Sequence, residues 1–163
     1  MKKAAILFAL IICFLASASA ALAQKGLFAV GGNLAISFDS ETFYAGISPK
    51  AQYYFSDHFR GEGAATFFLP KNSLMYLDIA VYAHYLFDIN DQARIYPVVG
   101  TGIYALSREK SIDLSAWPTL AVGGGIEYDF NERWTINGEL KYKIASNTSY
   151  SFGMLSMGLA YKF

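Results

Sequence analysis

The sequence predicts an all-β fold: an eight-stranded antiparallel up-and-down transmembrane β-barrel with a polar, side-chain-filled interior. Large apolar residues alternate with small or polar residues in about eight segments, as in strands whose two faces meet different surroundings. Hydrophobic residues make up 54% of the chain and aromatic residues 17%. After residue 23, no apolar run approaches the roughly 18 residues that a membrane-spanning helix needs. These residues therefore form either a soluble β core or the lipid-facing side of a barrel.

The first 23 residues have the three parts of a secretory signal peptide. Met1-Lys2-Lys3 is a basic start, an apolar run follows, and Ala21-Leu22-Ala23 is an A-x-A cleavage site. We expect cleavage after Ala23. The chain then divides into a signal peptide (1–23) and a mature β-barrel domain (24–163).

The composition of the mature domain excludes several classes of function. It contains no cysteine, because the single cysteine, Cys13, lies in the signal peptide. Disulfide bonds and thiolate metal sites are therefore impossible. Loss of Lys2 and Lys3 leaves 11 basic and 13 acidic residues, a net charge of −2, which argues against a nucleic-acid partner. The sequence indicates no cofactor and no metal site.

Four strands follow from the alternation in the first half of the domain. The first covers roughly Gly26–Ser37, and the second runs from Phe43 to Phe55 before a tight turn at 56–58. The third begins at Phe59 and ends at a turn over 70–73. The fourth has the cleanest apolar face, formed by Met75, Leu77, Ile79, Val81, Ala83, Tyr85 and Phe87.

The second half repeats the pattern with four more strands. Its expected elements are a turn at 88–92, a Gly-rich strand at 94–106, the longest loop at 107–115, strands at 116–130 and 134–144 joined by a turn at 131–133, a connection at 145–149 and the final strand at 150–163. Pro49, Pro97 and Pro118 fall within predicted strands. A closed barrel has no edge to accommodate a missing N–H group. We therefore expect a β-bulge or a strand end at each proline.

The distribution of aromatic residues favours a membrane barrel over a soluble one. A secreted lipocalin-like barrel keeps its apolar face inside and exposes polar residues to water. In this chain the apolar faces are nearly unbroken, whereas the opposite faces mix charged residues with Gly, Ser, Thr and Tyr. Aromatic residues also gather at strand ends beside the short turns, which is typical of an interfacial girdle around an outward apolar band. The girdle residues are Phe55, Phe59, Tyr85, Phe87, Phe130, Trp134 and Phe163.

The polar faces place six basic and five acidic residues inside the barrel. Near balance is what buried ion pairs require, because unpaired buried charge is costly, and an eight-stranded barrel is just wide enough for side chains to fill it. If Phe55 opposes Phe59, Gln52 faces Glu62 and Lys50 lies diagonal to it. We interpret the interior as an ion-paired plug, with a selective polar lumen as the alternative. The predicted interior polar cluster is Lys50, Gln52, Arg60, Glu62, Asp78, Glu127, Glu139 and Lys141, and the other inward charges are Arg94, Asp129, Lys143 and Lys162.

The last strand alternates without interruption and ends the chain on an aromatic residue. Its large apolar residues are Leu155, Met157, Leu159, Tyr161 and Phe163. A free strand of this kind would be a sticky edge, so we expect it to close the barrel against Gly26–Ser37. The chain resembles the small eight-stranded bacterial outer-membrane barrels of the OmpX and OmpA-domain type. The resemblance rests on this C-terminal strand, the leader, the size and the strand count over 24–163.

The resemblance implies a location and a route to it. In that family the C-terminal residues are an insertion signal read by the barrel-assembly machinery, after periplasmic chaperones have carried the chain. It also implies a monomer surrounded by outer-membrane lipid. The turns at 56–58, 88–92 and 131–133 would face the periplasm. The connections near 38–42, 70–73, 107–115 and 145–149 would face outside.

We expect a structural or surface-interaction role in the cell envelope, and no catalysis. Some outer-membrane barrels are lipid A deacylases or acyltransferases, and the deacylases place a histidine two residues before a nucleophilic serine. Neither His58 nor His84 is followed by such a serine, so both are interpreted as structural. A narrow porin-like channel for small solutes is the alternative function. A lipid-modifying enzyme is the least favoured.

Overall fold

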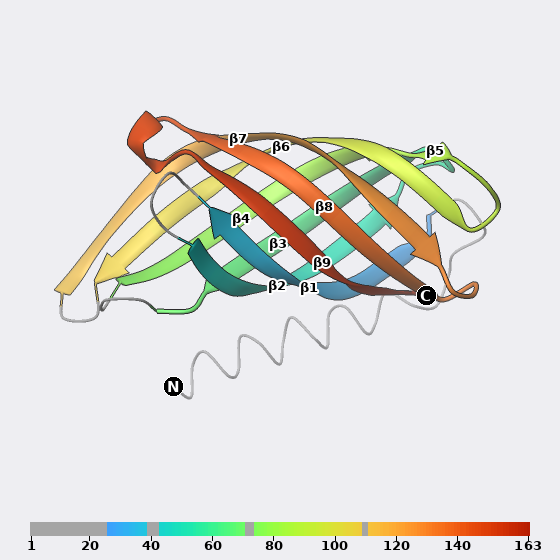
Figure 1. Ribbon diagram of the computed structural model, residues 1–163, viewed down its shortest axis with the longest axis horizontal. Coiled ribbons are helices and arrows are strands. Elements are labelled where there is room, and N and C mark those ends of the chain that lie inside the picture. Colours follow the sequence, from blue (N-terminus) through green and yellow to red (C-terminus); the bar gives the residue numbers. More distant parts are fainter. Residues whose placement is uncertain (1–25, 39–42, 71–73, 109–110) are drawn as a thin grey trace.

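The computed structural model describes residues 26–38, 43–70, 74–108 and 111–163, which form a closed antiparallel β-barrel (Figure 1). The predicted fold class is confirmed. The predicted signal peptide and most of the connections expected at 38–42 and 70–73 lie outside the described residues. The elements are β1 (Phe28–Phe38), β2 (Phe43–Tyr54), β3 (Phe59–Phe68), β4 (Leu74–Tyr85), β5 (Phe87–Asp88), β6 (Ala93–Arg108), β7 (Ser111–Asp129), β8 (Trp134–Ala145), the 3₁₀ helix η2 (Thr148–Tyr150) and β9 (Phe152–Lys162).

Consecutive strands pair with each other, except β4 with β5, and the pairings β1–β9 and β4–β6 close the ring. The strand order is β4-β3-β2-β1-β9-β8-β7-β6-β5, with β4 also paired to β6. β4 and β5 are two parts of one barrel strand, because both pair with β6 in a continuous register on either side of Leu86. The C-terminal strand β9 pairs antiparallel with β1, as Leu34 opposite Met157 illustrates. The barrel therefore has eight strands and no free lateral edge along its paired length.

The barrel has a polar inner face and an apolar outer face, the reverse of a soluble protein. Along β8, Thr135, Asn137, Glu139, Lys141 and Lys143 are buried. The residues between them point outward, and the exposed members of that face are Trp134, Leu140, Tyr142 and Ile144. Since side chains alternate across a strand, this register places the polar face inside and the apolar face outside. No helix in the described part of the chain is long and apolar enough to cross a membrane.

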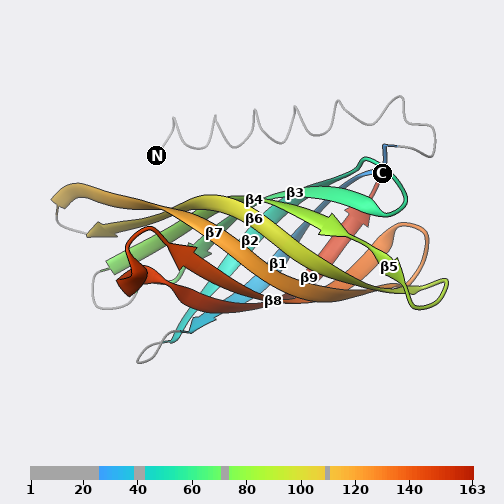
Figure 2. The same cartoon turned by 90° about the horizontal axis from the view of Figure 1, so that it is seen from above.

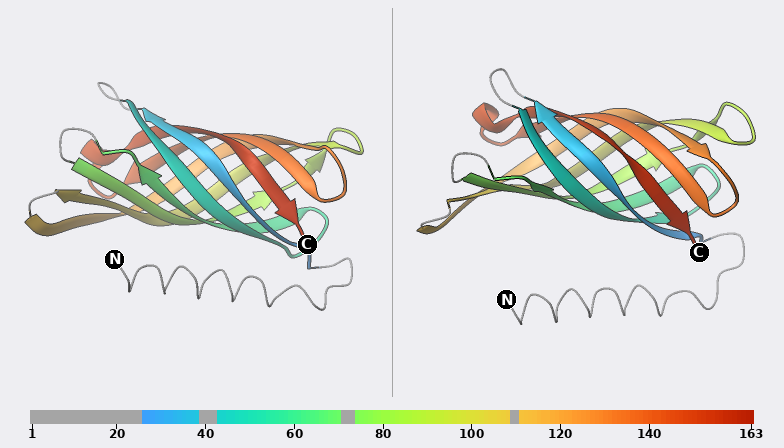
Figure 3. Two further views of the ribbon diagram at one scale, coloured as in Figure 1. Left: turned by 90° about the horizontal axis from the view of Figure 1, so that it is seen from below. Right: turned by 60° about the horizontal axis from the view of Figure 1, so that its bottom comes forward.

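The barrel has two different rims (Figures 2 and 3). The terminal rim carries Phe163 and the turns at 55–58, 89–92 and 130–133. The distal rim, at the other end, carries η2 and the β6–β7 hairpin, which extends beyond the remaining strands (Figure 1).

Polar side chains fix the three turns of the terminal rim. The Asn90 Oδ1 atom accepts hydrogen bonds from the backbone N–H groups of Gln92 and Ala93, at 2.9 and 2.8 Å. Asn131 Oδ1 does the same for the N–H groups of Arg133 and Trp134, at 2.9 Å each. In the third turn, Ser56 Oγ accepts from the N–H of Phe59 at 3.1 Å. Asn and Ser favour turns because their side chains replace a backbone acceptor in this way.

The expectation of a long loop at 107–115 is wrong. β6 continues to Arg108 and β7 begins at Ser111, and the two remain paired with a register shift between Ser107 and Arg108. Residues 109–110 lie outside the described residues. Backbone hydrogen bonds hold a two-stranded ladder whatever its side chains are. Beyond the apolar band neither face needs large apolar residues, so the sequence of this segment lacks the alternation that marks the other strands.

The expectation of a β-bulge or a strand end at each proline is also wrong, because all three prolines lie inside strands. The register is unchanged at all three. Instead, on one side of each proline the ladder lacks a residue pair at that position, although the Pro118 carbonyl still accepts a hydrogen bond from the N–H of Ser146 at 2.9 Å. Pro49 falls in a gap of the β2–β3 ladder, Pro97 in the gap where β4 gives way to β5, and Pro118 one residue beyond the end of the β7–β8 ladder. A residue without an N–H group is accommodated by omitting one bond of a ladder, which needs no extra residue.

Candidate functional site

Five residues of the predicted interior cluster meet in the middle of the barrel. Gln52 lies opposite Glu62, and its Nε2 atom donates to Glu62 Oε2 at 2.7 Å. Lys50 Nζ lies 3.3 Å from the same oxygen and 3.9 Å from Glu139 Oε1. Lys141 Nζ donates to Glu139 Oε2 at 2.5 Å. All five side chains are buried, so each carboxylate is neutralised by an ammonium group away from solvent.

Arg60 forms a second group nearer the terminal rim. Its side chain is 1% exposed, and Nη1 donates to Glu127 Oε2 at 2.6 Å and to the Tyr54 hydroxyl at 2.9 Å. The guanidinium also lies 3.0 Å from Nδ1 of His84. Its Cζ atom lies 4.9 Å from the centre of the Tyr96 ring. Arg60 therefore combines an ion pair with cation–π contact, which the planar guanidinium allows.

The last member of the predicted cluster, Asp78, forms an ion pair with Lys143, a residue left out of that cluster. Both side chains are at most 1% exposed. Lys143 Nζ also lies 5.2 Å from the centre of the Tyr82 ring, and Lys141 Nζ lies 4.4 Å from it. Both buried ammonium groups thus lie near one tyrosine ring.

Three hydrogen bonds of the interior cross the lumen. Lys50 on β2 donates to Asn137 Oδ1 on β8 at 3.0 Å. Arg60 on β3 bonds to Glu127 on β7, and Lys143 on β8 bonds to Asp78 on β4. In each pair the two strands are separated by two others on the shorter way round the barrel. Such bonds join opposite walls and place side chains across the axis.

Charged residues also surround the axis at the terminal rim. Asp129 accepts hydrogen bonds at Oδ1 from Lys162 Nζ at 2.7 Å and from Thr135 Oγ1 at 2.5 Å. Arg94 bonds to the other oxygen of Asp129, and its Nε atom lies 3.0 Å from Glu127 Oε1. Asp129 and Glu127 thus continue the central ion pairs to the end of the barrel.

The interior tyrosines were not part of the predicted cluster. Tyr54, Tyr82 and Tyr96 are each at most 6% exposed. The Tyr96 hydroxyl donates to Glu139 Oε1 at 2.9 Å, and its ring stacks on His84 at 4.9 Å and 20°. All three have the even-numbered parity of the charged faces in their strands, which is the signal that could have included them. Their rings fill interior space between the ion-paired side chains.

Glu62, His84 and Glu139 bring one ligand atom each within 4.8 Å of one another. Carboxylate oxygens and imidazole nitrogens are metal ligands. However, Lys50 and Lys141 already lie against the two carboxylates. A divalent cation would either displace these ammonium groups or be buried beside them, and both leave uncompensated positive charge in the interior. The donor set therefore fits an ion-pair network better than a metal centre.

The outer face presents a continuous apolar band with an aromatic girdle at the terminal rim. Phe55 contacts Phe59 with ring centres 5.6 Å apart, and Tyr85 contacts Phe87 at 4.9 Å. The members of the girdle are 42–57% exposed. Those members are Phe55, Phe59, Tyr85, Phe87, Phe130, Trp134 and Phe163. Aromatic rings at such a level are suited to the boundary between hydrocarbon and headgroups.

The C-terminal strand contributes to the same face. Leu155, Met157, Leu159 and Phe163 are 44–59% exposed, and Tyr161 is half-buried. The Tyr161 ring makes edge contacts with Trp134 at 5.1 Å and with Phe163 at 5.0 Å. The residues predicted as an insertion signal therefore all lie on the outward face of the strand that closes the barrel.

Comparisons with known proteins agree with this architecture. The family model for the outer membrane protein beta-barrel domain matches residues 6–163. Neisserial surface protein A is similar with a TM-score of 0.65 and 19% identity over 85% of this chain and 97% of that one. The N-terminal barrel of Pseudomonas aeruginosa OprF has a TM-score of 0.66, 14% identity and coverage of 85% and 100%. Ail of Yersinia pestis is similar with a TM-score of 0.58 and 19% identity over 86% of this chain and 100% of that one. No curated protein sequence matches the chain significantly.

Proposed function

Because the chain belongs to the outer membrane protein beta-barrel domain family, we propose that it is a closed, non-conducting barrel with a structural or surface-contact role. The protein is integral to the bacterial outer membrane, and lipid surrounds its apolar band. In this role the protein is a rigid body in the membrane, and its distal rim faces the outside of the cell.

The cross-lumen bonds carry this proposal. An eight-stranded barrel has room for side chains and little else. Lys50, Arg60 and Lys143 each join opposite walls. A solute passing through would have to separate buried ion pairs, and leaving one partner unpaired costs about 3–5 kcal/mol. A porin-like channel would therefore need a different arrangement of these residues.

Catalysis on lipid finds little support in the two histidines. His84 is 0% exposed and lies among Arg60 and Tyr96, so a lipid substrate has no access to it. His58 lies on the terminal-rim turn, 3.9 Å from Asp88. We therefore retain the non-enzymatic role.

Orientation and assembly are parts of the same proposal. Outer-membrane barrels have short turns in the periplasm and longer connections outside, and on this ground we assign the terminal rim to the periplasm. The outward residues of β9, from Leu155 to Phe163, would be read by the barrel-assembly machinery after periplasmic chaperones deliver the chain. The closed ring leaves no strand edge for self-association along its paired length, which favours a monomer.

Deletion of the gene separates the structural role from the channel role. We expect the deletion strain to become more sensitive to detergent, with unchanged uptake of small hydrophilic solutes, and a plasmid copy to restore resistance. Slower solute uptake with unchanged detergent sensitivity would contradict the proposal.

A further inference from the structure

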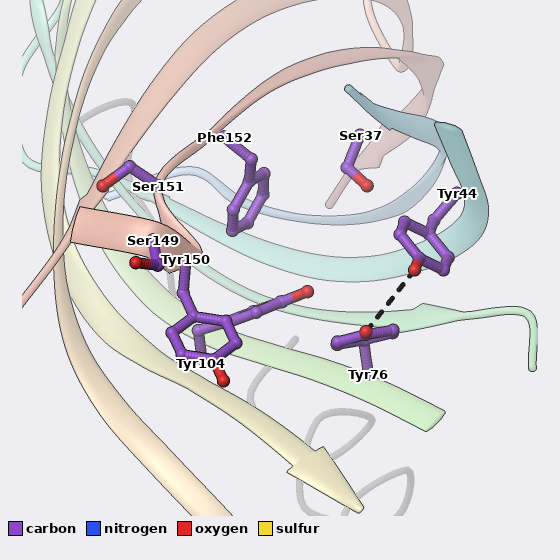
Figure 4. A pocket seen from close by; sticks show the side chains of 8 residues that line it. All are labelled: Ser37, Tyr44, Tyr76, Tyr104, Ser149, Tyr150, Ser151 and Phe152. Carbon is purple, nitrogen blue, oxygen red and sulfur yellow. Dashed lines mark hydrogen bonds between the residues drawn. The ribbon is translucent and has the colours of Figure 1, made fainter. Parts of the chain in front are cut away.

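A small cavity of about 120 Å³ opens at the distal rim, apart from the ion-paired interior (Figure 4). It is formed where the ends of β1, β2, β4 and β6 meet η2 and the start of β9. The residues that line it are Ser37, Tyr44, Tyr76, Tyr104, Ser149, Tyr150, Ser151 and Phe152. This volume is smaller than the roughly 300–1,000 Å³ of pockets for drug-sized ligands. The cavity is therefore suited to a small ligand about the size of one six-membered ring.

Aromatic rings in mutual contact form one side of the cavity. Tyr76 and Tyr104 are stacked, with ring centres 5.5 Å apart and planes at 10°. Tyr104 also contacts Phe152 at 4.8 Å, and Tyr44 contacts Tyr76 at 4.7 Å with their hydroxyl oxygens 3.4 Å apart. Tyr104 and Phe152 are only 6% and 5% exposed. This side is therefore held in place by packing before any ligand arrives.

The opposite side is fixed by η2. Asn147 caps this helix, since its Oδ1 atom accepts from the N–H of Ser149 at 3.3 Å. Tyr150 stacks on Trp117 of β7, with ring centres 3.9 Å apart and planes at 20°. Ser149 is exposed, and Tyr150 and Ser151 are half-buried, so solvent reaches the mouth of the cavity from this side.

The described residues of the lining combine aromatic rings with hydroxyl groups, and none of them is charged. Hydroxyl groups in the lining allow a polar ligand to form hydrogen bonds that a purely apolar ligand cannot form. A cation would find no carboxylate among the described residues of the lining. A pyranose has an apolar C–H face for stacking and hydroxyls at its edge for hydrogen bonds. We propose that this cavity binds one neutral hexopyranose unit of a glycan.

This inference deepens the proposed surface-contact role and rests on it for one point, the outward orientation of the distal rim. The same neutral sugar could belong to a glycolipid of the bacterial outer membrane or to a glycan from outside the cell. The recognition chemistry is shared, and the experiment separates the two sources.

Trp117 provides the readout, because it stacks on Tyr150 in the lining. The chain has two tryptophans, and Trp134 lies in the girdle at the other rim, so Trp134→Phe leaves Trp117 as the single reporter. The full mature protein, in lipid nanodiscs and free of glycoside detergent, is titrated with methyl β-D-glucopyranoside, methyl β-D-galactopyranoside and methyl α-D-mannopyranoside. We expect a saturable change in fluorescence with at least one of them, with a Kd of about 1–50 mM, and weaker binding of glucuronate.

Two lining variants and a matched control make the test specific. Tyr104→Ala and Tyr76→Leu should each raise the Kd by about fivefold or more, because each removes an aromatic contact. Tyr85→Ala removes a tyrosine from the lipid-facing girdle and should leave the Kd unchanged. Heat-dependent gel mobility shows which variants are folded, and Tyr76→Leu keeps the test decisive if Tyr104→Ala does not fold.

Competition identifies the source of the sugar. If vesicles containing complete lipopolysaccharide displace the methyl glycoside and vesicles of lipid A alone do not, the ligand is the membrane's own glycolipid. If neither competes while the glycosides bind, the ligand is an external glycan. Absence of saturable binding of all three glycosides up to about 100 mM, or preferential binding of choline or benzyl alcohol, would overturn the proposal. The titration depends on neither orientation nor the deletion phenotype, so its failure is distinguishable from failure of the proposed function.

Discussion

Removal of one partner from a cross-lumen ion pair should destabilise the barrel far more than removal of both. In Lys143→Met, the Asp78 carboxylate remains 1% exposed in the interior. Lys143 bonds to its Oδ2 atom, and the Oδ1 atom has no hydrogen-bond partner among the described residues. The variant therefore leaves a buried anion with none of its present hydrogen bonds. We expect a loss of about 3–5 kcal/mol in the free energy of unfolding.

The double variant Lys143→Met/Asp78→Leu supplies the decisive comparison. It removes both charges, and well-packed apolar replacements of buried ion pairs are often neutral, so we expect stability within about 1–2 kcal/mol of the wild type. Arg133→Met is the control, because Arg133 is exposed and bonds to Tyr161 at the surface; its effect should be about 0.5 kcal/mol or less. Stability is measured by urea unfolding in lipid vesicles, followed by fluorescence and gel mobility. Equal losses in the single and double variants would refute the reasoning.

Three further changes test the packing, the lipid-facing band and the assembly signal. Gly125→Ala places a Cβ atom 2.5–2.7 Å from the tip of the buried Tyr96 ring and should cost about 1–3 kcal/mol in unfolding experiments. Gly138→Ala, with open space around it, should be neutral or stabilising by up to about 1 kcal/mol. Leu140→Arg, on the outward face halfway along β8, should cost about 2–4 kcal/mol in vesicles; a cost below about 1 kcal/mol would contradict a lipid-facing position. Deletion of Phe163 should lower the amount of heat-modifiable barrel in cells and leave refolding into detergent intact; unchanged assembly in cells would contradict its role in the signal.

The sequence predicts the barrel well because lipid and lumen impose different chemistry on alternate residues. That constraint holds along the whole apolar band. The alternation of apolar and polar residues therefore predicts the strands, including β1 and β9, which close the barrel. The same parity places Lys50, Glu62 and their neighbours on the inward face.

The constraint ends where the membrane ends. The extension of β6 and β7 past Ser107 has no lipid-facing side to mark it in the sequence, so the residue pattern there predicts a loop. The cavity at the distal rim is missed for a related reason. Tyr44, Tyr104 and Phe152 come from strands far apart in the sequence, and only the curvature of the closed barrel brings their rings together.

Partner choice inside the barrel is equally hidden from the sequence. Parity places Lys143 on the inner face but does not show that it reaches Asp78, because the two strands are not neighbours. Pairs across the lumen depend on strand stagger, which alternation alone does not determine.

Single-channel conductance tests the central claim, that the lumen is closed by bonded side chains, most directly. Refolded wild-type protein, shown to be folded by its heat-dependent gel mobility, is inserted into a planar lipid bilayer beside the triple variant Lys50→Ala/Arg60→Ala/Lys143→Ala. We predict no reproducible current steps from the wild type and discrete steps from those triple-variant molecules that fold. Reproducible steps from the wild type would show that the cross-lumen bonds do not close the barrel.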